Sequence, residues 1–177
     1  ISPSLFRERD LAPLVRSVID EAGLPPGNLE LEITEGMLMG DVQRALAVLK
    51  ELKAMGVYIA IDDFGTGYSS LAYLKRLPVD ELKIDKSFVM NMESDLQDAK
   101  IVRSTVDLAH NLGLSVVAEG VENAKSWKLL AGLTCDEAQG YFIARPMPAA
   151  QFPHWARTWV PPDTTHEWLS TEFAAMI

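Results

Sequence analysis

Two adjacent acids in this chain end an apolar stretch and precede a glycine-rich turn. In "IAIDDFGTGYSSL" the acids are Asp62 and Asp63. Neighbouring carboxylates repel each other, and burying one is costly unless a cation or hydrogen bonds compensate. Mg²⁺, Mn²⁺ and Ca²⁺ prefer oxygen ligands, whereas structural zinc sites use cysteine and histidine. The pair therefore predicts a divalent metal site built from oxygen ligands.

Polar residues recur where four other apolar stretches end. They are Glu32 and Glu35, Lys83 and Asp85, Glu119 and Glu122, and Gln139. In a β/α barrel the carboxyl ends of the strands converge on one face, so we expect these side chains to gather there. Two metal ions about 3.5–4 Å apart are the usual apparatus for in-line attack on a phosphodiester. The alternative, isolated acids that cap helices in open loops, explains one or two positions but not all of them.

Lys83 and the glycine-rich turn have predicted roles beside these acids. Lys83 is expected to orient an attacking water, and a structural salt bridge is the alternative. Gly65 and Gly67 can adopt a positive φ, and Thr66 can satisfy a turn, so we expect a loop that positions the preceding aspartates. The Gly-x-Gly lacks the third glycine of a dinucleotide-binding fingerprint. A plain tight connection to the next helix remains the alternative.

Hydrophobic periodicity switches repeatedly between the strand and helix types. Strands are predicted at 29–35, 57–62, 81–85, 114–120 and, more weakly, 133–140. Helices are predicted at 10–23, 41–56, 68–78, 95–112, 124–131 and 149–159. The first of these helices should bury one face that contains Leu11, Leu14, Val15, Val18, Ile19 and Ala22. Such alternation predicts parallel β/α units.

The length suggests an incomplete barrel. A (β/α)₈ barrel takes about 250 residues, whereas this chain has 177 residues and begins "ISPS" without a methionine. We expect either a smaller open sheet or a barrel whose first strands are missing, and the abrupt start favours the second. We expect one domain over residues 1–159 and a tail over 160–177 that could form a short helix.

Composition narrows the classes of partner and compartment. With 25 acidic and 16 basic residues the net charge is −9, which argues against binding long nucleic acids. A single cysteine, Cys135, cannot form an internal disulfide and fits a reducing compartment. No apolar run reaches the roughly 18 residues of a membrane helix, and the start lacks the apolar region of a signal peptide.

Five motifs, in this order along the chain, resemble the EAL domain family. They are "EITE", "DDFGTGYSSL", "LKIDKSF", "AEGVE" and "QGY", and the likeness extends to about Met147. The resemblance implies a bacterial phosphodiesterase that hydrolyses cyclic di-GMP to linear pGpG. It also implies a TIM-like (β/α)₈ barrel with one antiparallel strand, of which this chain lacks the first strands.

The resemblance implies a role for each matching residue. Metal ligands would be Glu32, Asp62, Asp63 and Glu119, with Glu119 alternatively a general base. Lys83 would contact the catalytic water, and Gln139 would bind substrate. Glu35 would hold the loop at 64–71, and Glu122 would be a supporting carboxylate. Two Mg²⁺ or Mn²⁺ ions per site are implied, with Ca²⁺ as a candidate inhibitor. Also implied are a homodimer, upstream sensory or diguanylate-cyclase-like domains, and a cytoplasmic domain whose parent could be membrane-tethered.

One departure from the family pattern bears on activity. The Glu-Ala-Leu motif that names the family is not in these 177 residues, and the family's asparagine ligand would fall just before Ile1. We therefore expect the chain alone to bind metal weakly and to turn over poorly. The alternatives to a phosphodiesterase are a non-catalytic cyclic di-GMP receptor and a dimerisation or scaffold module.

Overall fold

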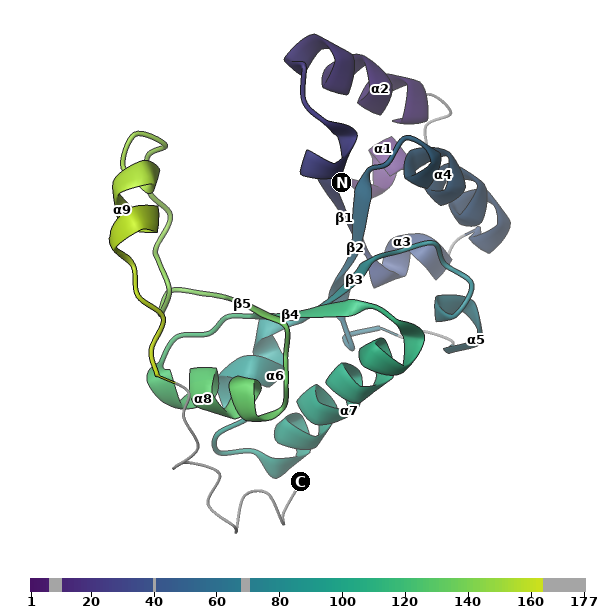
Figure 1. Cartoon of the computed structure of the whole chain (residues 1–177). Coiled ribbons are helices and arrows are strands. Elements are labelled where there is room, and N and C mark those ends of the chain that lie inside the picture. Colours follow the sequence, from purple (N-terminus) through teal and green to yellow (C-terminus); the bar gives the residue numbers. More distant parts are fainter. Residues whose placement is uncertain (7–10, 40, 68–70, 164–177) are drawn as a thin grey trace. The chain divides into compact units, whose positions relative to one another are not determined.

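A computed structural model describes residues 1–6, 11–39, 41–67 and 71–163 (Figure 1). The chain divides into two compact units. The first comprises residues 1–83 and 109–115, and the second comprises residues 84–108 and 116–177. Most of the predicted tail, at 164–177, lies outside the described residues, as do positions 68–70 of the predicted loop and helix.

The first unit is built on parallel strands. β1 (Glu30–Thr34), β2 (Tyr58–Phe64) and β3 (Glu81–Ile84) follow one another in the sheet order. β1 and β2 pair in parallel, with Glu32 opposite Ala60 and Thr34 opposite Asp62. Ile33, Ile59 and Leu82 are each 0% exposed, which places the core of this unit around the centres of the strands.

Short and long helices cover these strands. They are α1 (Pro3–Phe6), α2 (Leu11–Ala22), the 3₁₀ turn η1 (Pro26–Asn28), α3 (Glu35–Met39), α4 (Val42–Ala54) and α5 (Leu71–Leu74). α4 packs against α2 and α3 (Figure 1). It begins at Asp41, whose side chain accepts a hydrogen bond from the Arg44 N–H, as expected of an N-cap. Leu49 and Leu52, both 0% exposed, attach it to the core.

The predicted buried face of α2 is wider than the face that the structure buries. Leu11, Val15 and Ile19 are buried together with Ala12, but Leu14 is 47% and Val18 is 52% exposed. Ala22, at the helix end, is exposed as well. Burial of Ala12 means that the helix is rotated toward that side. At 100° per residue, Leu14 and Val18 then turn away from the packed stripe.

The second unit repeats the strand-helix alternation. It contains α6 (Lys86–Asn91), most of α7 (Leu96–Leu112), β4 (Ser115–Glu119), α8 (Ala124–Gly132), β5 (Glu137–Gln139) and α9 (Phe152–Thr158). β4 and β5 pair in parallel, with Glu119 opposite Gln139. After β5 the chain forms α9 and returns to α8 (Figure 1), where the ring centroid of Trp159 lies 6.0 Å from that of Trp127.

The predicted fold class, α/β with parallel strands, is confirmed, and each predicted strand is present. Within the described residues, three short α-helices were not predicted: α1, α3 and α6. They have four to six residues each, too few to show a helical period in the sequence. Within the described residues, no helix combines the length and apolar character that crossing a membrane demands.

Candidate active site

A buried lysine is paired with acids from two neighbouring strands of the first unit. The side chain of Lys83, on β3, is 5% exposed. Its Nζ donates a hydrogen bond to Oε1 of Glu32 on β1, and it lies 3.7 Å from Oδ1 of Asp62 on β2. A buried ammonium needs such partners, because its desolvation is otherwise uncompensated. Three strands thus bring one cation and two carboxylates together, with Glu32 in the middle of β1 and with Asp62 and Lys83 nearer the carboxyl ends of β2 and β3.

The backbone turns sharply at the second aspartate. Asp63 has a φ of +54°, a left-handed conformation that is unfavourable for most residues but is tolerated by Asp and Asn. Its N–H donates to Oδ1 of Asp62 at 3.0 Å. A carboxylate oxygen of Asp63 lies within 4.8 Å of one of Asp62. Strict strand alternation would have pointed these two side chains to opposite faces, and the left-handed residue removes that constraint.

The glycine-rich turn after Asp63 is held by a buried carboxylate. Glu35, the first residue of α3, is 3% exposed, and its Oε2 accepts from the N–H groups of Gly65 and Gly67, both at 3.3 Å. A Cβ on Gly67 would lie 2.9 Å from Cδ of Glu35, so a larger residue here would displace the Glu35 carboxyl group. Thr66 Oγ1 donates to the carbonyl oxygen of Asp63 at 2.9 Å. Positions 68–70 of the predicted loop lie outside the described residues.

The remaining predicted site residues belong to the second unit. Glu119, half-buried, and Gln139, exposed, are the last residues of β4 and β5 and face each other in the register. Glu122 is exposed in the segment that follows β4. Glu119 and Gln139 therefore lie at the carboxyl-terminal edge of the β4–β5 pair.

One polar residue at a strand end is a helix cap. Asp85 is the N-cap of α6 and accepts from the Ser87 N–H at 2.9 Å. For this residue the simpler alternative, an acid that caps a helix, accounts for the position. It does not account for Glu32 or Asp62, which contact Lys83 rather than a helix terminus.

Comparison with known proteins places the chain in a family. The EAL domain model matches residues 1–146. The chain belongs to the EAL domain family. The resemblance seen in the motifs is therefore confirmed, and with it the EAL-type α/β fold.

Relatives of this EAL domain include characterised signalling proteins. The chain is 47% identical over 151 residues to the bifunctional diguanylate cyclase/cyclic di-GMP phosphodiesterase MucR of Pseudomonas aeruginosa, a match that covers 85% of this chain and 22% of MucR. The solved complex of the PaMucR phosphodiesterase with c-di-GMP superposes with a TM-score of 0.84 at 47% identity, covering 86% of this chain and 62% of that one. The chain spans about a fifth of the length of the curated relatives it matches.

A second solved relative contains metal ions. The manganese and cyclic di-GMP complex of Klebsiella pneumoniae BlrP1 superposes with a TM-score of 0.75 at 35% identity, covering 81% of this chain and 37% of that one. BlrP1 has also been solved with calcium and cyclic di-GMP, with the same TM-score of 0.75.

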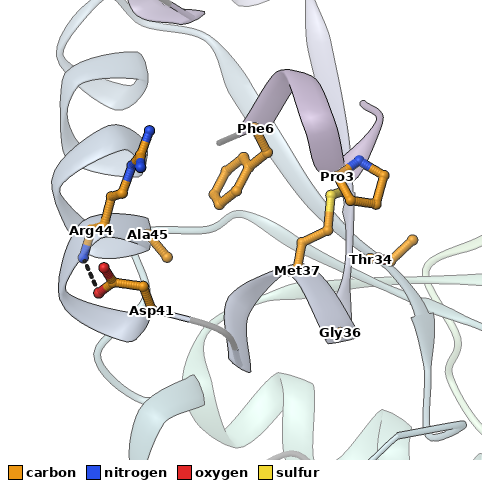
Figure 2. A pocket seen from close by; sticks show the side chains of 8 residues that line it. All are labelled: Pro3, Phe6, Thr34, Gly36, Met37, Asp41, Arg44 and Ala45. Carbon is orange, nitrogen blue, oxygen red and sulfur yellow. Dashed lines mark hydrogen bonds between the residues drawn. The ribbon is translucent and has the colours of Figure 1, made fainter. Parts of the chain in front are cut away.

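The first unit of this EAL domain also has a cavity. Figure 2 shows it between α1, α3 and α4, where Phe6, Met37 and Arg44 are among the residues that line it. Its volume is about 460 Å³. None of the predicted site residues is among the described residues that line it. The candidate active site is therefore assigned to the polar strand ends and not to this cavity.

Two ionisable groups in the second unit of the EAL domain have shifted pKa values. Burial raises the pKa of the Cys135 thiol to about 12, so the thiol stays protonated and is a poor nucleophile. Burial also opposes ionisation of Glu93. Hydrogen bonds from Ser126 and Asn123 and the charge of Lys125 outweigh that effect and lower the pKa of Glu93. Neither residue is one of the predicted site residues.

Proposed function

We propose that the protein containing this EAL domain hydrolyses cyclic di-GMP to linear pGpG. The observation that carries the proposal is the buried ammonium of Lys83 on β3, between Glu32 on β1 and Asp62 on β2. Such an arrangement keeps a fixed positive charge beside acids that can bind metal. The cyclic di-GMP phosphodiesterase activity in the name of MucR supports the choice of substrate.

The donor set fits divalent metal ions that prefer oxygen. We propose Glu32, Asp62, Asp63 and Glu119 as ligands of two Mg²⁺ or Mn²⁺ ions. Carboxylates suit these ions, and the set contains no sulfur or imidazole that would favour zinc. When bound, the ions would lower the pKa of water and stabilise charge on the phosphodiester. Ca²⁺ shares the ligand preference but accepts looser geometry, so we propose that it inhibits.

The residues of the chain have separate tasks in this reaction. Lys83 orients the water, whose oxygen forms a bond to phosphorus while the P–O bond to the ribose 3′-oxygen breaks. Glu119, if it acts as the general base, accepts the proton of the water, and the departing oxygen takes up a proton. The product is linear pGpG with a terminal phosphate.

Other residues bind substrate or hold the ligands in place. The amide of Gln139 both donates and accepts hydrogen bonds, which suits a nucleotide. Glu35 holds Asp63 indirectly, through the N–H groups of Gly65 and Gly67 in the turn that follows it. We assign Glu122 a supporting role at the strand ends of the second unit.

Hydrolysis by the full-length protein tests this function. With Mg²⁺ or Mn²⁺ present, Asp62→Asn should lower the rate of pGpG formation by about 10² or more, because a ligand charge is lost. Asp41→Asn is the matched control, since Asp41 caps α4 and asparagine caps equally well. The phosphodiesterase assignment is abandoned if Asp62→Asn hydrolyses at the wild-type rate. Tight binding of cyclic di-GMP without turnover would instead indicate a receptor.

The proposal also covers the bounds, the cellular location and the oligomeric state of the domain. We propose that it occupies residues 1–159 of this chain, that it lies in the cytoplasm, and that the protein forms a homodimer. The name of MucR combines cyclase and phosphodiesterase activities, so we also propose a further signalling domain in the protein. Sedimentation of the full-length protein tests the dimer.

A further inference from the structure

Two glycines end the parallel strands of the second unit, and neither has room for a side chain. Gly120 follows β4 with a φ of +73°. A Cβ at this position would lie 2.5 Å from Cβ and 3.2 Å from Cα of Lys86, the first residue of α6. Such a separation is far inside van der Waals contact, so α6 packs directly on the backbone of Gly120.

Gly140, after β5, is packed against a peptide group. A Cβ there would lie 2.1 Å from the carbonyl oxygen and 2.4 Å from the nitrogen of Val121. The Val121 N–H donates to the carbonyl oxygen of Gln139, and its carbonyl oxygen accepts from the Phe142 N–H, both at 3.0 Å. The side chain of Val121 is 0% exposed. The backbone at Val121 is therefore anchored by its side chain and by hydrogen bonds to both sides of Gly140.

These contacts come directly after two of the three candidate site residues of the second unit. Glu119 directly precedes Gly120, and Gln139 directly precedes Gly140. On the basis of the proposed function, we infer that Gly120 and Gly140 are positioning residues: by allowing these close contacts they set the direction of the Glu119 and Gln139 side chains. A displacement of about 1 Å in a catalytic group can lower a rate by about 10², so the space at each glycine matters for catalysis.

A third glycine, Gly113, allows the effect of the close contact at Gly120 to be distinguished from the effect of a positive φ. Gly113, at the amino end of β4, has a φ of +76°, close to that of Gly120, but a Cβ there would meet nothing within 4 Å. Alanine is strained by a left-handed backbone at both positions. The contact with Lys86 exists only at Gly120. Gly113→Ala is therefore a matched control for Gly120→Ala.

The experiment uses the full-length protein with four further variants. They are Gly120→Ala, Gly113→Ala, and Gly120→Ala combined with either Lys86→Gly or Lys86→Ala. Lys86→Gly removes the blocking Cβ, whereas Lys86→Ala removes the charge but keeps that atom. The measurements are kcat and KM for cyclic di-GMP, Mn²⁺ affinity by electron paramagnetic resonance, and the melting temperature.

The inference predicts a specific pattern of loss and rescue. Gly120→Ala should lower kcat by about tenfold to 10² and weaken Mn²⁺ binding, whereas Gly113→Ala should lose stability but keep kcat and Mn²⁺ affinity. Adding Lys86→Gly should restore both quantities, and adding Lys86→Ala should not. If Gly120→Ala does not fold, recovery of folding with Lys86→Gly but not with Lys86→Ala still supports the contact.

Two results would overturn the inference. One is that Gly120→Ala resembles Gly113→Ala in kcat and Mn²⁺ affinity. The other is that Lys86→Gly and Lys86→Ala act alike in the Gly120→Ala background. A wild-type protein that binds Mn²⁺ but does not hydrolyse cyclic di-GMP would contradict the proposed function and not this inference. In that case the Mn²⁺ affinities and melting temperatures of the variants would still test whether Gly120 positions Glu119.

Discussion

Lys83 and Glu32 form an ion pair, and neutralising one partner should lower the free energy of unfolding by a different amount than neutralising the other. The Lys83 side chain is 5% exposed, whereas that of Glu32 is 45% exposed. Glu32→Gln keeps the size of the side chain but removes the charge that faces the ammonium. Lys83→Met removes the ammonium but keeps a side chain about as long as the aliphatic stem of lysine. Glu32→Gln therefore leaves a buried ammonium without its main partner, whereas Lys83→Met leaves a carboxylate that is in contact with water.

The cost of Glu32→Gln follows from the burial of Lys83. The ammonium would keep a weakened bond to the amide oxygen and the Asp62 carboxylate 3.7 Å away. Hydrogen bonds to charged groups contribute about 1.5–3 kcal/mol, and part of that is lost. We expect the free energy of unfolding to fall by about 1–2 kcal/mol, since water around the exposed Glu32 already screens the pair.

Lys83→Met should lower the free energy of unfolding less than Glu32→Gln does, but it should strongly lower the rate of hydrolysis. The carboxylates left behind can be hydrated, because Asp62 is 24% exposed and Glu32 is more so. The thioether fills the buried space left by the lysine stem. We expect a loss below about 1 kcal/mol, as for pairs with solvent-exposed carboxylates, together with a fall of about 10² in hydrolysis, since the group that orients water is gone.

Denaturant titrations and hydrolysis assays on both variants check this reasoning. The titrations need a chelator, so that metal binding does not add to the stability of the wild type. Asp41→Asn, at the N-cap of α4, provides a baseline for removing one charge outside the pair. A Lys83→Met protein that is destabilised more than Glu32→Gln would refute the idea that burial of the ammonium governs the pair.

Three further predictions concern single side chains. At Asp63, with its φ of +54°, Asn should preserve the melting temperature, whereas Val should lower the free energy of unfolding by about 2 kcal/mol; equal melting would contradict this. Because burial raises the pKa of Cys135 to about 12, iodoacetamide at about pH 8 should modify it only after unfolding, and mass spectrometry would reveal any native labelling. Glu93 has a lowered pKa in the folded state, so its ionised form stabilises the fold above the ordinary value of 4.5 and this contribution disappears as the pH falls through the folded pKa. The stability gap between wild type and Glu93→Gln should therefore close in acid, and a gap independent of pH would be evidence against it.

The strands and long helices could be predicted from local patterns. A continuous apolar run such as 57–61 is buried because it lies in the centre of a parallel sheet, and the helical spacing of Leu49 and Leu52 follows from a single packed face. The acids at the strand ends were visible in the sequence for the same reason. Asp62 and Asp63 interrupt an apolar run close to the end of β2, and Glu119 does so at the end of β4. Glu32 differs, because it lies in the middle of β1.

Contacts between distant residues were decided only by the tertiary structure. The sequence alone determined which residues carry charge, but the pairing of Lys83 with Glu32 depends on sheet order and register. Alternation placed Asp62 and Asp63 on opposite faces, and only the left-handed backbone at Asp63 overrides it. The lack of space at Gly120 and Gly140 depends on atoms of Lys86 and Val121. Sequence periodicity reports burial along one segment, whereas these features arise where separate segments pack together.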